Sequence, residues 1–394
     1  MIGFDEAQLR LAEAVKPLAS EEVALVDASG RVLSEPVIAA VSSPRRDVSA
    51  MDGFALRNAD AALGARFRVI DASFAGGEPP PQVGPSEAVR IFTGAAMPQS
   101  ADRVVMQENC ALEDQTMTIT ADYGPGWHVR KLASDFATGD LLLPAGRLLD
   151  PRAIMLLAGA DRANAIVHCR PRVAIIATGD ELAAPGTAHG NPLLIPESVS
   201  FGVAAMAEQF GAWIVARYSG ADDLPALRRL AGKALAAADV VIVTGGASVG
   251  ERDYGKAMFA GQELELLFDK VAIRPGKPVW LGQAQGRWVL GLPGNPTSAM
   301  VTARLFLAPL LAGLQGRLTS DALNWEFGRL ATSLSTGGER TSFVRASLSP
   351  EGLRPVTSQD SAGQAALSTA EFLVRVDPGA PEQSFAGLVQ ALRF

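Results

Sequence analysis

Three runs of sequence decide the fold: RVAIIATG (172–179), DVVIVTGG (239–246) and RWVLGLPG (287–294). Each run is apolar and rich in β-branched residues, and each ends in a glycine-bearing turn, which is typical of a strand buried on both faces. Helical patterns separate the runs, most clearly DLPALRRLAGKALAAA (223–238). Strands that alternate with helices at this spacing predict a three-layer αβα domain with a mainly parallel sheet over 169–314.

The sequence on either side of this domain predicts three further units. Residues 5–18 have the pattern of an amphipathic helix, and we expect a second short helix within 20–40. The stretch from 42 to 130 has short β-like runs punctuated by Gly and Pro. The predicted units are a discontinuous elongated α/β scaffold domain (1–41 plus 131–168), a β-rich inserted module (42–130) and a C-terminal β domain (315–394).

The composition of the chain excludes several classes of protein and of metal site. The chain has 394 residues, of which 48% are hydrophobic and 20% charged, as in an ordinary globular protein. A net charge of -7 argues against a nucleic-acid partner. No stretch suggests a membrane span or a leader, so we expect a cytoplasmic protein. Cys110 and Cys169 lack CxxC spacing, and the three histidines are scattered, which argues against a metal site built on cysteine or histidine.

Four glycine-bearing turns carry the candidate chemistry. Glycine lets the backbone approach an anion closely, and a helix that starts there adds its positive end. One such turn is usually only a turn, but four at one end of one sheet would form a rim for phosphate groups. They are ATGDEL (177–182), TGGASVGERDYGK (244–256), IRPGKP (273–278) and GLPGNPTSA (291–299).

These turns also carry charges of both signs. Carboxylates can hold Mg²⁺, and Lys or Arg can neutralise an oxyanion. Two alternatives stay open, because Asp222 could instead cap the next helix and Ser248 could simply form a turn. The acidic residues are Asp180, Glu181, Asp222 and Asp253, and the basic ones are Lys256, Lys270, Arg274 and Lys277.

The order of six motifs resembles the molybdopterin molybdenumtransferases, the family that includes the E domain of gephyrin. Two of them, TGDEL and GGxSxG, also occur in the related adenylyltransferase, whereas SAMDG, PGKP and GLPGNP point to the molybdenum-inserting member. The resemblance implies an elongated homodimer whose αβα domain binds molybdopterin. The motifs are SAMDGFA (49–55), RIFTGAAMP (90–98), TGDEL (178–182), TGGASVGERDY (244–254), RPGKP (274–278) and GLPGNPTSA (291–299).

The resemblance also implies a reaction and a set of site residues. The substrates would be adenylylated molybdopterin and molybdate, the released product AMP, and the cofactor Mg²⁺ held by Asp222 and Asp253. The pathway's adenylyltransferase would be a transient partner. Asp52, Thr93 and Asp135 would face the site from the partner subunit. The implied catalytic residues are Asp52, Asp135, Glu181, Asp222 and Asp253, and the implied substrate-binding residues are Thr93, Gly245, Gly246, Ser248, Lys270, Arg274, Lys277, Pro293, Gly294, Arg340 and Ser361.

The chain departs from the family pattern at several positions. Arg274 stands where Lys is usual, Val199 replaces an Asn, and QDSAGQ (359–364) replaces a GSH-like run. One alternative is the adenylyltransferase, which would need only the αβα domain. Another is a non-catalytic pterin-binding scaffold, which loss of Asp222, Asp253 or Lys277 would indicate, but all three are present. A molybdate-sensing regulator would need a helix-turn-helix, which the sequence lacks.

Overall fold

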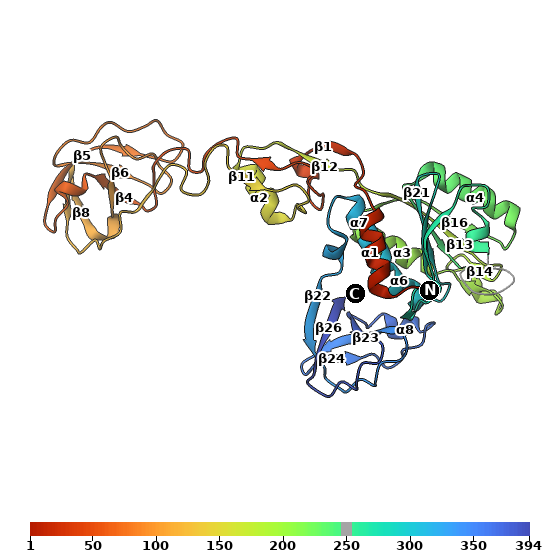
Figure 1. Ribbon diagram of the computed structural model, residues 1–394. Coiled ribbons are helices and arrows are strands. Elements are labelled where there is room, and N and C mark those ends of the chain that lie inside the picture. Colours follow the sequence, from red (N-terminus) through yellow and green to blue (C-terminus); the bar gives the residue numbers. More distant parts are fainter. Residues whose placement is uncertain (246–253) are drawn as a thin grey trace.

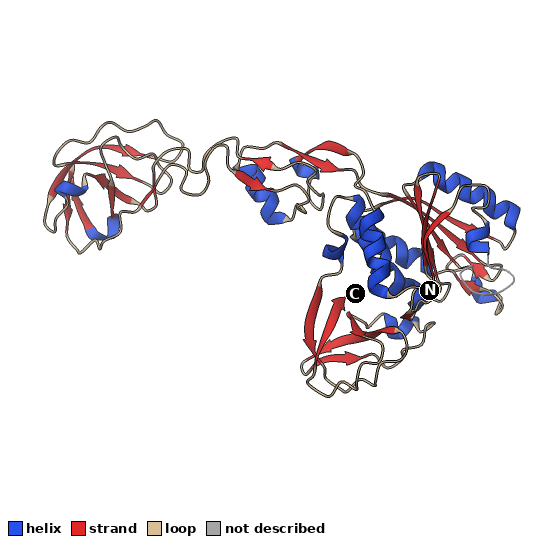
Figure 2. Ribbon diagram, in the orientation of Figure 1, coloured by secondary structure: helices blue, strands red, loops and turns tan. Residues whose placement is uncertain are grey.

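The computed structural model describes residues 1–245 and 254–394, and the molecule is elongated (Figure 1). The β-rich module lies at one end and the αβα and C-terminal domains lie at the other, with the scaffold between them. Figure 2 shows that helices gather around the αβα sheet, whereas strands dominate the module and the C-terminal domain. The αβα and C-terminal domains, together with the helix α1 (Phe4–Ala14), are called the body below.

The sheet of the αβα domain has six strands in the order β16-β13-β17-β21-β20-β18. The first four strands run parallel, and β20 and β18 are antiparallel to their neighbours. This arrangement confirms the predicted mainly parallel sheet. The strands are β16 (Trp213–Gly220), β13 (Arg172–Thr178), β17 (Val240–Thr244), β21 (Arg287–Leu292), β20 (Trp280–Ala284) and β18 (Glu265–Asp269).

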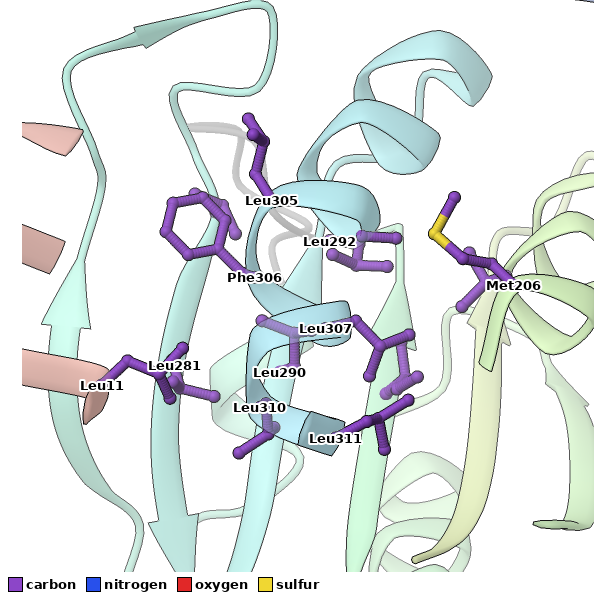
Figure 3. Close-up of a cluster of buried hydrophobic side chains, with 14 of the residues drawn as sticks. Leu11, Met206, Leu281, Leu290, Leu292, Leu305, Phe306, Leu307, Leu310 and Leu311 are labelled. Carbon is purple, nitrogen blue, oxygen red and sulfur yellow. The ribbon is translucent and has the colours of Figure 1, made fainter. Parts of the chain in front are cut away.

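Helices cover both faces of this sheet. One face packs on α4 (Leu224–Ala237) and the short α5 (Tyr254–Ala257). The other packs on α3 (Val199–Gln209) and on a continuous helical run, Pro296–Leu314, made of α6 (Pro296–Thr302), a π-helical turn and α7 (Ala308–Leu314). Figure 3 shows leucines of this run pointing at strand and α3 side chains.

The run Pro296–Leu314 is 19 residues long. Among the described residues it alone is long and apolar enough to cross a membrane, yet 94% of it is buried inside the protein. Burial on all sides explains why it is apolar all round, since it is the central helix of a core. The expectation that no apolar stretch approaches membrane-spanning length was therefore wrong.

The N-terminal helix α1 belongs to the body, which differs from the predicted assignment of residues 1–41 to the scaffold. Phe4 and Leu11 are buried in the same core as the run Pro296–Leu314. Pro309 has no N–H, so it cannot make the helical hydrogen bond to the carbonyl of Leu305. The side-chain Nε2 of Gln8 in α1 donates to that oxygen at 2.8 Å. Apolar burial and this hydrogen bond therefore fix α1 to the body.

The scaffold is made of paired strands from distant parts of the chain. β1 (Ser20–Ala24) pairs with β12 (Asn164–His168), and β2 (Val37–Ile38) pairs with β11 (Leu141–Leu143) beside α2 (Pro151–Gly159). The predicted second short helix within 20–40 corresponds to the 3-10 helix Leu25–Asp27, but the strand β1 before it was not predicted. A local pattern does not reveal that β1 has a strand partner more than a hundred residues away.

The module is a six-stranded sheet in the order β7-β4-β6-β5-β9-β8, with its own buried core around Phe54 and Phe67. A two-stranded connection, β3 (Val48–Ser49) with β10 (Val129–Arg130), leads to it. Its strands are β7 (Arg103–Met106), β4 (Gly53–Leu56), β6 (Glu87–Ile91), β5 (Arg66–Ser73), β9 (Thr116–Ile119) and β8 (Cys110–Glu113).

The C-terminal domain has a sheet in the order β19-β23-β25-β26-β22, with β24 (Gly352–Pro355) paired to β23. One strand comes from outside the domain, because β19 (Ile273–Arg274) belongs to the RPGKP segment and runs parallel to β23 (Thr341–Ser349). The others are β25 (Phe372–Val376), β26 (Leu388–Arg393) and β22 (Trp325–Arg329). The strand β19 therefore joins the αβα domain to the C-terminal domain.

Candidate functional site

Three of the four glycine-bearing turns lie together. Ala177, Thr244 and Leu292 are in register on the neighbouring parallel strands β13, β17 and β21, so the turns that follow meet at one edge of the sheet. A Cβ on Gly245 would lie 2.5 Å from the carbonyl oxygen of Thr178 and one on Gly294 would lie 3.5 Å from the Cα of Gly245, so these backbones pack closely. A rim of backbone turns at this edge is the arrangement expected for a phosphate group.

The fourth turn, RPGKP, lies in the connection from β18 to β20 and so reaches the same edge of the sheet, as predicted: Asp269 at the end of β18 pairs with Trp280, which pairs with Gly291 of β21. Its extended residues, Ile273–Arg274, also add to the edge of the C-terminal sheet. The side chain of Arg340 reinforces the connection, because its Nη1 donates to the carbonyl of Ile273 at 3.1 Å. The segment therefore lies between the two domains.

The acidic residues of the strand-end turns lie at the same edge as the glycines. The backbone N–H of Asp222 donates to Oδ1 of Asp180 at 3.0 Å, which brings the turns after β13 and β16 together. The capping role considered for Asp222 belongs to Asp223, whose Oδ2 accepts from the N–H of Ala226 at 3.0 Å. Glu181 is exposed in the turn after β13. Gly246, Ser248 and Asp253 lie outside the described residues.

A cleft of about 810 Å³ opens between the RPGKP segment and the C-terminal domain. Four of the predicted site residues line it: Arg274, Lys277, Arg340 and Ser361. The first two are exposed at its mouth. Glu339 and Asp360 also line the cleft, so the walls carry both charges with the cations in excess. We call this space the cationic cleft; its size suits a small organic ligand or cofactor.

Ser361 connects the cationic cleft to the GLPGNP turn. The side-chain Nδ2 of Asn295 donates to Oγ of Ser361 at 3.1 Å, and the N–H of Thr297 donates to the carbonyl of Ser361 at 3.0 Å. Pro293 and Gly294 therefore lie just before a residue that contacts the cleft wall. The glycine rim and the cationic cleft are thus neighbouring parts of one surface of the body.

Arg345 is a cleft residue that the sequence did not indicate. It lies on β23, is only 1% exposed, and lines the cationic cleft. Its Nη1 is buried and has no hydrogen-bond partner among the described residues. Burial lowers the pKa of this guanidinium, and the positive charge of Arg274 lowers it further, while Asp360 opposes both. A buried cation without a full set of partners is costly unless an anion satisfies it.

The predicted partner-side residues lie in or next to the module, away from the cationic cleft of the same chain (Figure 1). Asp52 Oδ1 accepts from the N–H of Thr93 at 2.7 Å and from its Oγ1 at 2.8 Å. These hydrogen bonds, with the charge of Arg90, lower the pKa of Asp52. Gly53 is required beside it, because a Cβ there would lie 2.0 Å from the Val105 carbonyl oxygen.

Two further predicted residues do not join either group. Asp135 is exposed in the linker next to the module, where its N–H donates to the carbonyl of Ser43 at 3.0 Å. Lys270 follows β18 at a positive φ of 65°, and it is not among the residues that line the cationic cleft. Within one chain, the predicted site residues of the body therefore lie together, and those of the module lie together at a separate place.

Comparisons with known proteins agree with this architecture. Residues 2–160 match the family model described as the MoeA N-terminal region (domain I and II), and residues 174–313 match the one described as a probable molybdopterin binding domain. The molybdopterin molybdenumtransferase of Haemophilus influenzae is 36% identical over 80% of this chain and 78% of its own length. The enzyme of that name from Nostoc is also 36% identical, over 84% and 77%.

Solved structures resemble the chain over its whole length. A structure of the molybdopterin biosynthesis MoeA protein of Pyrococcus horikoshii has a TM-score of 0.83 at 27% identity, covering 100% of this chain and 99% of that one. A second structure of that protein has a TM-score of 0.87 at 23% identity and covers 100% of both chains. This likeness extends over all the domains, and the sequence relatives share most of their length with the chain. The chain belongs to the molybdopterin molybdenumtransferase family.

Proposed function

We propose that this protein inserts molybdenum from molybdate into adenylylated molybdopterin, with release of AMP. The observation that carries the proposal is the cationic cleft, which is lined by Arg274, Lys277, Arg340 and the buried Arg345. Molybdate is a tetrahedral dianion, and charge-assisted hydrogen bonds from Arg and Lys are the strong way to hold an oxyanion. The family membership supplies the reaction class.

The glycine rim would receive the phosphate groups of the pterin substrate. Gly245 has a φ of 88°, a left-handed conformation, and packs against Thr178 with no room for a side chain. The backbone can therefore approach a ligand there more closely than any other residue type would allow. Together, rim and cleft would place the phosphoanhydride and the oxyanion side by side. The chain's part in the reaction is to orient both substrates and neutralise their charge.

Mg²⁺ is part of the proposal. The described residues contain no group of three or more His, Cys, Asp or Glu side chains able to hold a metal ion. Mg²⁺ does not need one, because it is commonly bound through one or two carboxylates together with substrate phosphates and water. The adjacent Asp180 and Asp222 fit that donor set, and Asp253 is the further carboxylate that the family resemblance implies. The ion would supply charge neutralisation of the phosphates.

The proposal also includes a homodimer. Asp52 and Thr93 lie at the far end of the chain from the cationic cleft (Figure 1), so a second copy would have to bring its module to the cleft. Asp135, at the base of the module, would be carried with them. We place the protein in the cytoplasm, where the pathway's adenylyltransferase would be a transient partner. The elongated shape, with the module held away from the body, supports exchange of this kind between copies.

The test is to incubate the purified protein with adenylylated molybdopterin and Mg²⁺, with and without molybdate, and to measure AMP release and molybdenum bound to the pterin. We expect AMP release that depends on molybdate and matches the molybdenum inserted. AMP release without insertion, or tight pterin binding without turnover, would contradict the proposal. The second outcome would favour a non-catalytic binding protein.

A further inference from the structure

The segment QDSAGQ (359–364) forms part of the wall of the cationic cleft, which its first three residues line. It follows β24 and leads into the short helix α8 (Gln364–Leu367). Hydrogen bonds fix the segment at two places, first to β23 in the C-terminal domain and then to the GLPGNP turn of the αβα domain. We call it the bridge segment, because it connects the two domains on either side of the cleft.

Gln359 fixes the bridge segment to β23. Along one edge of β23, β19 pairs with Thr341 and Ser342, whereas β24 pairs only from Ala346 onward. Arg345 lies between these two pairings. Its N–H donates to Oε1 of Gln359 at 3.0 Å, and its carbonyl accepts from Nε2 of Gln359 at 2.9 Å. The side-chain amide of Gln359 therefore extends the hydrogen bonding of this edge, at the residue whose side chain lines the cationic cleft.

The second anchor of the bridge segment is the start of the helical run Pro296–Leu314. The N–H of Thr297 belongs to the first turn of the helix, where N–H groups have no partner inside the helix, and it donates to the carbonyl of Ser361 at 3.0 Å. Asn295 is the N-cap residue, yet its side chain makes no capping hydrogen bond. Its Nδ2 donates to Oγ of Ser361 at 3.1 Å instead. Both the backbone and the hydroxyl of Ser361 are therefore held by the αβα domain.

The contact with Asn295 determines how the Ser361 hydroxyl can act. A hydroxyl has one proton to donate and two lone pairs that accept. The Asn295 amide uses a lone pair, so the proton stays available, and no described residue accepts it. The carboxylate of the adjacent Asp360 accepts from the N–H of Ala362 at 2.7 Å. The hydroxyl is therefore a fixed donor in the same cleft as the cations.

We propose that Asn295 and Gln359 are positioning residues that hold the Ser361 hydroxyl as a hydrogen-bond donor to the oxyanion in the cationic cleft. This inference rests on the function proposed above. Asn295 sets the direction of the hydroxyl, and Gln359 keeps the bridge segment against Arg345. Both polar atoms of the Gln359 amide are used by the Arg345 backbone, so Gln359 acts through its neighbours. A donor that is already oriented binds more tightly, because less freedom is lost when the ligand arrives.

The test measures the dissociation constant of inorganic molybdate by equilibrium dialysis with the full-length protein. Asn295→Ala and Gln359→Ala are each made with and without Ser361→Ala. We expect Ser361→Ala to raise the dissociation constant about tenfold, as for loss of one hydrogen bond to a charged group. Asn295→Ala and Gln359→Ala should each raise it about threefold or more in the wild-type background.

In the Ser361→Ala background the same two substitutions should change the dissociation constant by less than about twofold, because the hydroxyl through which they act is gone. Additive losses would overturn the inference. So would an unchanged dissociation constant in either single variant, or no measurable binding of molybdate to the wild type.

Gln315→Ala is the matched control for lost stability. Gln315 follows the other end of the helical run, is 5% exposed, and donates from Nε2 to the carbonyls of Phe210 and Leu311 at 2.8 and 2.9 Å. Its loss should lower the melting temperature at least as much as Gln359→Ala does, while the dissociation constant of molybdate stays within about twofold. An equal rise in that constant for both variants would show that Gln359 is purely structural.

Molybdate binding also separates this inference from the proposed function. In the insertion assay, Gln359→Ala should raise the KM for molybdate, while the KM for adenylylated molybdopterin stays within about twofold. If molybdate binds with the expected coupling to Ser361 but the wild type releases no AMP, the proposed function is wrong and the inference stands. If the wild type inserts molybdenum but the losses are additive, the inference is wrong and the proposed function stands.

Discussion

The two ends of the molecule differ in the kind of ligand chemistry that they offer. The body end has the cationic cleft, lined by Arg274, Lys277, Arg340 and Arg345, next to a rim of glycine turns. The module end has a fixed carboxylate beside a stack of two aromatic rings. Each end has its own hydrophobic core, so each can hold its groups in place independently of the other.

This difference shows how the recognition of different chemical groups can be divided between the two ends of an elongated chain. In the function proposed above, charge at the body end would hold the oxyanion and the phosphates, whereas the module end offers a carboxylate acceptor and aromatic rings. Substitutions at the two ends should therefore impair the protein in different ways. The predictions below follow that difference, from the largest expected effect to the smallest.

Lys277→Ala should have the largest effect. Lys277 is exposed at the mouth of the cationic cleft, so its loss removes charge stabilisation without removing packing. Loss of one well-placed electrostatic donor typically lowers kcat by about 10²–10³. The insertion assay should show this loss while the circular dichroism melting curve stays unchanged. Lys16→Ala, an exposed lysine before the scaffold, is the control and should retain full activity. Equal activity of the two variants would remove Lys277 from the site.

Arg345→Met should separate stability from function. The Arg345 side chain is buried, and its Nη1 has no partner among the described residues, so an apolar side chain of similar length should fold as well or better. The oxyanion would lose charge-assisted hydrogen bonds, which corresponds to a rise of at least about tenfold in the KM for molybdate. A thermal melt and the KM measure the two effects. A lower melting temperature with an unchanged KM would show that Arg345 is purely structural.

Asp239→Asn should affect only the folding of the body. Asp239 is 8% exposed and accepts hydrogen bonds from Arg172 and Arg287 at the other end of the strands from the glycine rim. Burial alone would raise the pKa of Asp239, but the contacts with Arg172 outweigh it, so the pKa lies below its ordinary value of 3.8. Loss of the charge should lower the free energy of unfolding by about 1–3 kcal/mol at pH 7.

The pH dependence of this effect has a definite sign. A carboxyl whose pKa is lowered by folding stabilises the fold above its unfolded pKa, and that contribution is lost as the pH falls through the folded value. The difference in the free energy of unfolding between wild type and Asp239→Asn, measured in urea, should therefore have its full value at pH 7 and shrink below about pH 4. Activity per folded molecule should be unchanged at pH 7. A difference that grows towards acid pH would contradict this account of Asp239.

The sequence predicted the αβα domain because its signal is local. Apolar β-branched runs and glycine-bearing turns are visible in a short window, and all four turns lie at the expected edge, after β13, β17 and β21 and between β18 and β20. The pairing of β19 with β23 was not predicted, because β23 lies about seventy residues later in the chain. The strand β1 was not predicted for the same reason, since its partner is β12.

The site could be predicted only where a motif marked it. Arg274, Lys277, Arg340 and Ser361 were expected, and all four line one cleft. Arg345 was missed because an arginine in a β-strand usually faces solvent, and only packing reveals its burial. The stack of Phe74 on Phe92, next to Asp52, was missed because the two rings follow neighbouring strands. Both features depend on contacts between segments that no spacing rule brings together.

One measurement tests most directly whether the two ends form one site between copies. Lys277→Ala damages only the body end and Asp52→Ala only the module end, so each variant alone should be nearly inactive in molybdenum insertion. In an exchanged mixture of equal amounts, half of the dimers contain one chain of each kind, and one of their two sites is intact, so about a quarter of wild-type activity should return. A mixture no more active than the sum of its components would show that the site is not shared between copies.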